Sequence, residues 1–77
     1  MEYTIEFEGK SWNCRHGGPF DRGSADSYYG RDFDPHCYVG RTGDILVDKE
    51  NLTPDEIVEY TKGYEYNEMF GEKKDWG

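Results

Sequence analysis

Two cysteines and two histidines are the residues of this chain whose types could hold a metal ion. Cys14 and His16 are separated by one residue, and His36 and Cys37 are adjacent. Thiolate and imidazole groups are common ligands of structural zinc, which takes four of them in a tetrahedral arrangement, but each pair in a zinc module is usually spaced by two to four residues. We therefore expect reduced thiols and no cofactor, with a zinc site or a Cys14–Cys37 disulfide as the alternatives.

The sequence contains no arrangement that is typical of catalysis. His16 and His36 have Asp21 and Asp34 nearby in the sequence, but no nucleophile motif, zinc-protease motif or phosphate-binding loop accompanies them. Gly17 and Gly18 are not followed by the lysine and hydroxyl residue that a phosphate-binding loop needs. We expect a protein that is not an enzyme.

The charge of the chain limits the partners that it can bind. Its 77 residues carry a formal net charge of −8, and residues 44–77 hold ten acidic residues against four basic ones. Such a chain forms one small domain. Direct binding of duplex nucleic acid is not expected, because that binding depends on basic residues that neutralise phosphates. A protein whose carboxylates imitate DNA is an alternative.

The apolar residues predict a folded protein without a membrane anchor. No apolar stretch approaches the roughly 20 residues that a membrane-spanning helix needs. Met1 is followed by Glu2 and not by the basic and apolar segments of a secretory leader. Aromatic residues make up 17% of the chain, which is unlike a disordered sequence. We expect a cytoplasmic domain with an aromatic core.

The first half of the sequence predicts a β-hairpin and a short helix. Hydrophobic residues alternate over 3–7, a turn follows at 8–10, and a weaker strand returns over 10–14. Residues 15–21 read as a loop because of Gly17, Gly18 and Pro19. A short helix is expected at about 23–30, with Ser24 as its N-cap and Gly30 as its end. Residues 36–39 are expected to be extended, and residues 45–47 to form a strand or an extended connector.

The last third predicts a longer helix at about 54–70, which completes an α+β fold. Thr53 is placed as the N-cap, Pro54 as the first helical residue and Glu56 as the partner of a capping box. Leu52 and Ile57 are spaced for a hydrophobic staple across this start. Gly71 is expected to end the helix, and Trp76 in the tail is expected to dock.

Aromatic residues fall on both sides of this predicted helix. The core face is expected to hold Ile57, Tyr60, Thr61 and Tyr64, and the opposite face Glu59, Gly63, Tyr66 and Phe70. In one interpretation, the short helix packs into the notch at Gly63 with its Tyr28 and Tyr29. In the other, Tyr66 and Phe70 form a binding patch.

Two segments carry a resemblance to known proteins. DRGSADSYYGRDFDPH (21–36) and LTPDEIVEYTKGYEYNE with a terminal KKDWG (52–77) resemble a group of small proteins encoded by tailed bacteriophages of proteobacteria. More distantly, the chain is similar to ribosome modulation factor, whose glycine, arginine and aromatic pattern is matched at Arg22, Gly23, Gly30, Arg31, Pro35, Tyr60, Gly63 and Tyr64. The first resemblance implies an accessory role in infection, and the second implies a helical hairpin that associates with ribosomes.

The leading functional prediction is a phage accessory protein that binds a host protein in the host cytoplasm. Its predicted contact residues are Tyr66, Phe70, Glu59, Gly63, Arg22, Tyr28, Tyr29 and Arg31. The alternative is a ribosome- or RNA-associated modulator, which would use the arginines of the middle segment, Arg15, Arg22, Arg31 and Arg41.

Overall fold

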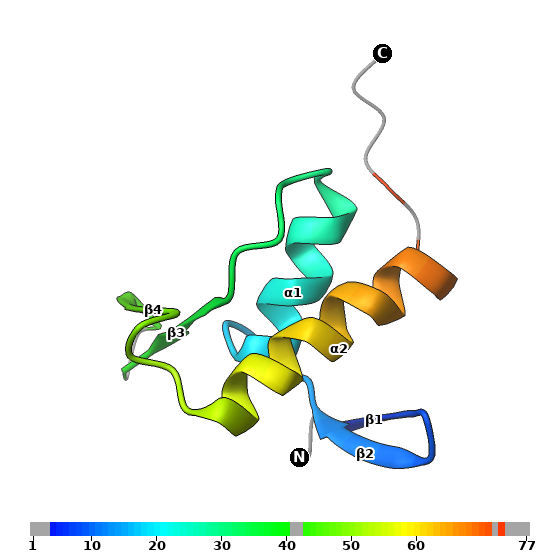
Figure 1. Ribbon diagram of the computed structural model, residues 1–77, viewed down its shortest axis with the longest axis horizontal. Helices are drawn as coiled ribbons and strands as arrows, with labels where there is room; N and C mark the ends of the chain where they lie inside the picture. Colours follow the sequence, from blue (N-terminus) through cyan, green and yellow to red (C-terminus); the bar gives the residue numbers. More distant parts are fainter. Residues whose placement is uncertain (1–3, 41–42, 72, 74–77) are drawn as a thin grey trace.

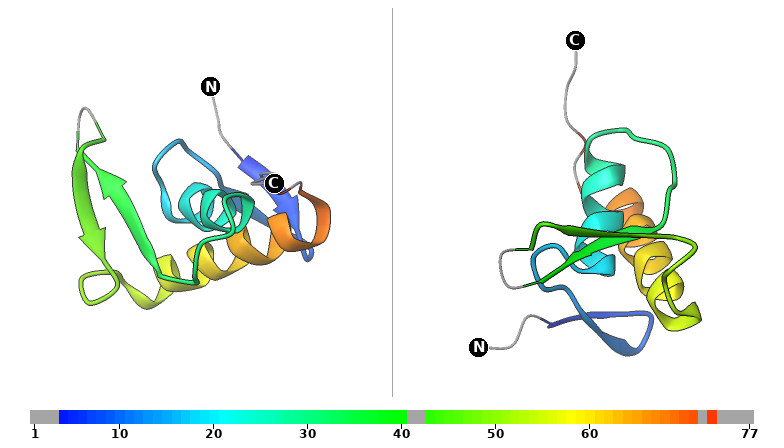
Figure 2. Two further views of the ribbon diagram at one scale, coloured as in Figure 1. Left: turned by 90° about the horizontal axis from the view of Figure 1, so that it is seen from above. Right: turned by 90° about the vertical axis from the view of Figure 1, so that its left-hand side faces the viewer.

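Two helices cross at the centre of the molecule, and a small β-hairpin lies on either side of them (Figures 1 and 2). The computed structural model describes residues 4–40, 43–71 and 73. The elements, in chain order, are β1 (Thr4–Phe7), β2 (Lys10–Asn13), α1 (Pro19–Tyr28), β3 (His36–Val39), β4 (Ile45–Asp48) and α2 (Pro54–Phe70). The predicted α+β class is confirmed. Tyr3, Arg41 and Trp76, about which the sequence also made predictions, lie outside the described residues.

The predicted N-terminal hairpin is present. β1 and β2 are antiparallel, with Ile5 opposite Trp12 and Phe7 opposite Lys10. The two-residue turn between them has positive φ angles at both Glu8 (55°) and Gly9 (74°), which matches the right-handed twist of a hairpin. The register places Phe7 and Trp12 on the side that faces the helices, where both are buried.

The predicted bounds of the first helix, and the loop assigned to residues 15–21, are wrong at the N-terminal side. α1 begins at Pro19, and Gly18 occupies the N-cap position that was assigned to Ser24. Proline is favoured in the first turn because its missing N–H has no partner there in any case. The buried ring of Phe20 fixes this turn against Trp12. At the other end, Gly30 follows the helix in the left-handed conformation (φ 69°) that its predicted role requires.

A second hairpin, between residues 36 and 48, was expected only as separate extended segments. β3 and β4 pair antiparallel, with Cys37 opposite Val47 and Val39 opposite Ile45. β3 lies against α1, whereas β4 forms the outer strand. Ile45 and Leu46 on that outer strand are more than half exposed.

The predicted start of the long helix is confirmed in detail. The Thr53 hydroxyl accepts a hydrogen bond from the Glu56 N–H at 3.2 Å, and the Glu56 carboxylate accepts one from the Thr53 N–H at 2.9 Å. These two bonds satisfy backbone donors that the helix itself cannot pair. Leu52, just before the helix, is buried. No helix in the described part of the chain has the length and apolar character that a membrane crossing requires.

The two helices touch through glycines. A Cβ atom at Gly23 would lie 2.1 Å from the carbonyl oxygen of Tyr60, and one at Gly63 would lie 2.0 Å from that of Phe20. Only glycine permits this approach of the two backbones. The assignment of Gly63 to the face opposite the core is therefore wrong. The short helix does pack into the Gly63 notch, but through Phe20 and not through Tyr28 and Tyr29.

Candidate partner-binding site

A buried carboxylate links the two helices at their centre. Asp26 on α1 is only 3% exposed, and its carboxylate accepts a hydrogen bond from the hydroxyl of the fully buried Tyr60 on α2. Arg22 Nη2 and Arg31 Nη1 lie 3.8 and 3.6 Å from Asp26 Oδ1, so the buried charge has two counterions. Burial, followed by the bond to Asp26, raises the pKa of Tyr60, which keeps its hydroxyl protonated as a donor.

His36 extends this cluster from α1 to β3. Its Nδ1 lies 2.7 Å from the carbonyl oxygen of Asp34, and its Nε2 lies 3.2 Å from Arg22 Nε. Because Arg22 is always a donor, Nε2 accepts and Nδ1 carries the proton that bonds to Asp34. Arg22, Arg31 and His36 also line a pocket of about 290 Å³ together with Asp26, Asp32, Asp34 and Tyr38.

The residues that carry the ribosome modulation factor resemblance converge on the helix crossing. Gly23 and Gly63 form the close contact, Arg22 and Arg31 flank Asp26, and Tyr60 bonds to it. The Tyr64 hydroxyl donates to the Arg31 carbonyl at 3.0 Å. Pro35 is buried, and Gly30 ends α1. These positions have a direct role in holding the fold together.

Tyr66 and Phe70, which were predicted to form a binding patch, lie side by side on α2, and only Phe70 is largely exposed. Tyr66 is half-buried and packs on the core cluster of Phe7, Trp12 and Phe20. Phe70 is 65% exposed, and its ring meets those of Phe7 and Tyr66 at centroid distances of 6.1 and 5.3 Å. Met69 beside it is equally exposed. We call Met69 and Phe70, with the supporting ring of Tyr66, the aromatic patch.

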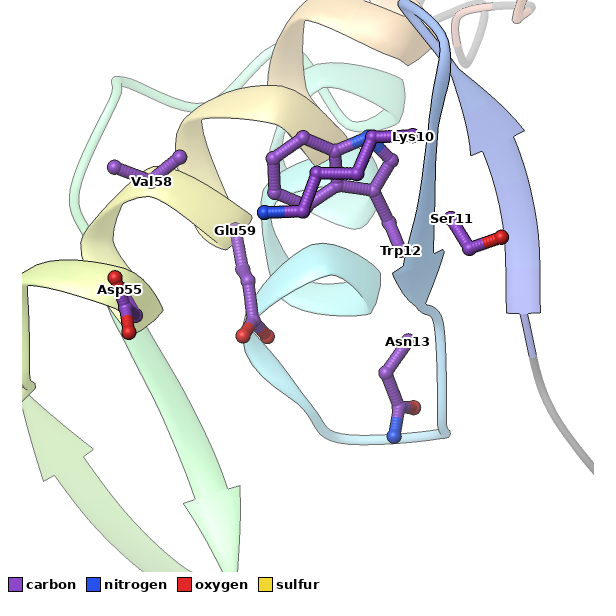
Figure 3. A pocket seen from close by; sticks show the side chains of 7 residues that line it. All are labelled: Lys10, Ser11, Trp12, Asn13, Asp55, Val58 and Glu59. Carbon is purple, nitrogen blue, oxygen red and sulfur yellow. The ribbon is translucent and has the colours of Figure 1, made fainter.

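A groove runs between β2 and the first half of α2 (Figure 3). Its volume is about 170 Å³, and its lining is Lys10, Ser11, Trp12, Asn13, Asp55, Val58 and Glu59. The Lys10 side chain crosses the Trp12 ring, with its Nζ 4.5 Å from the ring centre. Glu59, predicted as a contact residue, lies in this β2–α2 groove and not in the aromatic patch. Burial, then Glu56 and Asp55, raise the pKa of Glu59.

Three predicted contact residues, Tyr28, Tyr29 and Arg31, lie at and just after the C-terminal end of α1. The rings of Tyr28 and Tyr29 meet edge to face at 5.0 Å, and the Arg31 guanidinium lies 4.8 Å from the centre of the Tyr29 ring. Tyr28 is more exposed than Tyr29. Since Arg22 and Arg31 also approach Asp26, part of their charge is used within the fold.

The four weak zinc candidates are not assembled into one site in the described part of the chain. Cys37 is fully buried, and Cys14 is half-buried beside the core cluster. Both are free thiols, so the alternative disulfide is not seen. His16 is exposed, with its Nδ1 3.9 Å from Asp21 Oδ2, whereas His36 Nδ1 bonds to the carbonyl oxygen of Asp34. No group of three or more His, Cys, Asp or Glu side chains positioned for a metal ion occurs among the described residues.

Several important residues were not predicted from the sequence. Asp26 was not singled out, nor was the polar contact in which Ser27 donates to Glu68 and accepts from Asn67. Lys10, Trp12 and Asp55 were not predicted to share a groove with Glu59. The one sequence signal that could have indicated the role of Asp26 is its position inside a helical segment, as a charged residue with aromatic residues before and after it.

Comparisons of the chain with protein-family models, curated proteins and solved structures found no significant match.

Proposed function

We propose that this chain is a phage-encoded accessory protein that acts without catalysis by binding a host protein through the aromatic patch. The observation that carries the proposal is the exposure of Met69 and Phe70, each 65%, with the Phe70 ring in contact with the buried ring of Phe7. Exposed apolar side chains that continue a core are typical of protein-binding surfaces. The resemblance to small phage proteins suggests that the partner belongs to the host.

The hydrogen bonds of the buried polar side chains support the same proposal. Asp26 and Tyr60 are buried and His36 is half-buried, and each forms a polar contact with a residue outside its own helix or strand. Buried groups that hold elements together stabilise a scaffold. A rigid scaffold keeps a small contact surface in one shape, which lowers the entropy that binding costs.

The experiment is an affinity purification of the tagged protein from infected cells. The test variant is Met69→Ser/Phe70→Ser, because Tyr66 supports the core and is better left unchanged. The matched control is Ile45→Ser/Leu46→Ser, since these residues on β4 are 56% and 57% exposed. We expect the control to recover the wild-type partner and the patch variant to lose it. Equal recovery by both variants would refute the patch.

The second candidate is a ribosome-associated protein. It is favoured by a pocket that Arg22 and Arg31 line together. The carboxylates of Asp26, Asp32 and Asp34 line the same pocket and oppose a phosphate there. Sedimentation through a sucrose gradient at low salt separates the two candidates, because only a ribosome-associated protein travels with the ribosomal fractions.

A further inference from the structure

We propose that the partner segment that contacts the aromatic patch is an extended strand, which pairs with the outer edge of β1. The inference rests on the proposed function, because it assigns a backbone conformation and a side-chain pattern to the same partner. Its test uses a synthetic peptide and no host protein, so the two can fail separately.

The outer edge of β1 presents backbone groups that no other part of the described chain pairs. Phe7 and Lys10 flank a two-residue turn, and the residues that flank such a turn exchange both hydrogen bonds. Bonded pairs alternate along an antiparallel ladder, so Ile5 also bonds across to β2, whereas the N–H and C=O groups of Thr4 and Glu6 point away from it. Among the described residues, β2 alone pairs with β1. Such an edge can accept a further strand.

The aromatic patch continues the layer of side chains beneath β1. Ile5 and Phe7 face the helices, and the Phe7 ring centre lies 6.1 Å from that of Phe70. Figure 3 shows β1 on the side of β2 that is away from Asp55 and Val58, so the first half of α2 does not cover its outer edge. Neighbouring strands lie about 4.8 Å apart. The partner side chain opposite Phe7 would therefore come within reach of Phe70.

The two faces of the added strand require different side chains. On the face toward the helices, Phe7 and Phe70 favour apolar residues. On the other face, the exposed carboxylate of Glu6 forms no hydrogen bond or ion pair with another described residue. An opposite charge directly across a strand pair is stabilising, so the residue opposite Glu6 is lysine or arginine. A second copy of this chain fits less well, because each copy carries a net charge of −8.

The test is an NMR titration of the isotope-labelled protein with the peptide Val-Lys-Val-Lys-Val, acetylated and amidated at its ends. Two N-methylated forms of this peptide are the matched pair. Methyl groups on the two lysine nitrogens block the N–H groups that would face β1, whereas methyl groups on the last two valine nitrogens block N–H groups that would face away. Both forms have the same composition and charge, so non-specific attraction is equal.

We expect saturable shifts of the Thr4 and Glu6 amide resonances with the unmodified peptide and with the valine-methylated form. The lysine-methylated form should bind at least about tenfold more weakly, because it loses two hydrogen bonds to the edge. Glu6→Gln should weaken binding of the unmodified peptide by about threefold, because the cross-strand charge pair is lost.

The aromatic patch should contribute to the same binding. Met69→Ser/Phe70→Ser should weaken the binding of the unmodified peptide, whereas Ile45→Ser/Leu46→Ser on β4 should not.

Equal affinity for the two methylated peptides, or no shift at Thr4 and Glu6, would overturn the proposal. Shifts at these residues that depend on protein concentration without peptide would also overturn it, because they would identify a second copy as the occupant of the edge. Any of these results leaves the aromatic patch and the proposed function to the affinity purification.

Discussion

The hydroxyl of Tyr60 on α2 donates a hydrogen bond to the carboxylate of Asp26 on α1, and both side chains are buried. These residues are 34 positions apart in the chain. The bond therefore fixes the crossing of α1 and α2. The positions of both hairpins and of both candidate surfaces depend on that crossing. Removing one partner of a buried charged hydrogen bond is costly, because the other partner loses its compensation.

Asp26→Ala should destabilise the fold by about 3–5 kcal/mol, because Arg22, Arg31 and Tyr60 lose their common partner. Tyr60→Phe should cost about 1.5–3 kcal/mol, because the two arginines still neutralise Asp26. Urea unfolding followed by circular dichroism measures both. Asp32 is exposed and lines the same pocket as Asp26. Asp32→Ala should therefore change the free energy of unfolding by less than about 0.5 kcal/mol. Equal losses for Asp26 and Asp32 would show that the buried cluster does not hold the helices.

Gly23→Ala and Gly63→Ala should each prevent the helices from meeting as they do. The added methyl groups would overlap backbone carbonyl oxygens, which cannot rotate away as side chains do. We expect a loss of at least about 2–3 kcal/mol for each. Gly9→Ala is the control, because it has open space around it and only a positive φ, at a cost of about 1 kcal/mol. A stable Gly63→Ala protein would contradict the close crossing.

Glu59→Gln should not weaken the fold at neutral pH. Burial and two acidic neighbours raise the pKa of Glu59 in the folded state, so folding favours its protonated form. Stability from this group is present below its ordinary pKa of 4.5 and is lost as the pH rises through the raised folded value. The neutral variant should therefore melt about 1–3 °C higher at pH 7 and match the wild type in acid.

The control for this pH dependence is Glu50→Gln, which should follow the wild type at each pH. Melting curves at pH 3.5, 5 and 7 measure the difference. A Glu59→Gln protein that is less stable than wild type at pH 7 would show that the Glu59 charge has a counterion in the fold.

The two cysteines should differ in reactivity. Burial, followed by the Glu56 carboxylate, raises the pKa of Cys37, and its side chain is fully buried. Because the thiolate is the reactive form, Cys37 should react with an aromatic disulfide reagent only after unfolding. The half-buried Cys14 should react at least about tenfold faster in the native protein. Cys14→Ser and Cys37→Ser separate the two signals, and fast labelling of the Cys14→Ser protein would contradict the buried position of Cys37.

The sequence predicted the elements whose signals are local. The start of α2 depends on Thr53, Pro54 and Glu56, which contact one another, so short-range rules were sufficient there. The start of α1 was missed because Gly17, Gly18 and Pro19 together read as a loop. It is set by the burial of Phe20, a tertiary contact that no local pattern contains.

The candidate surfaces were harder to predict for a different reason. Gly63 has no side chain, so a hydrophobic pattern cannot place it on the core face. Asp26 is buried because partners from α1, β3 and α2 surround it, and their approach depends on the whole fold. The β2–α2 groove likewise joins segments more than 40 positions apart. Phe70 was placed on the outer face of its helix by periodicity alone, and it is exposed there.

The most direct test of partner binding through the aromatic patch is site-specific photo-crosslinking in infected cells. Benzoylphenylalanine would replace Met69 in the patch or, as the control, the similarly exposed Leu46 on β4. We predict a discrete adduct with one host protein from position 69 and none from position 46. An adduct from position 46 alone, or no adduct from position 69, would contradict it.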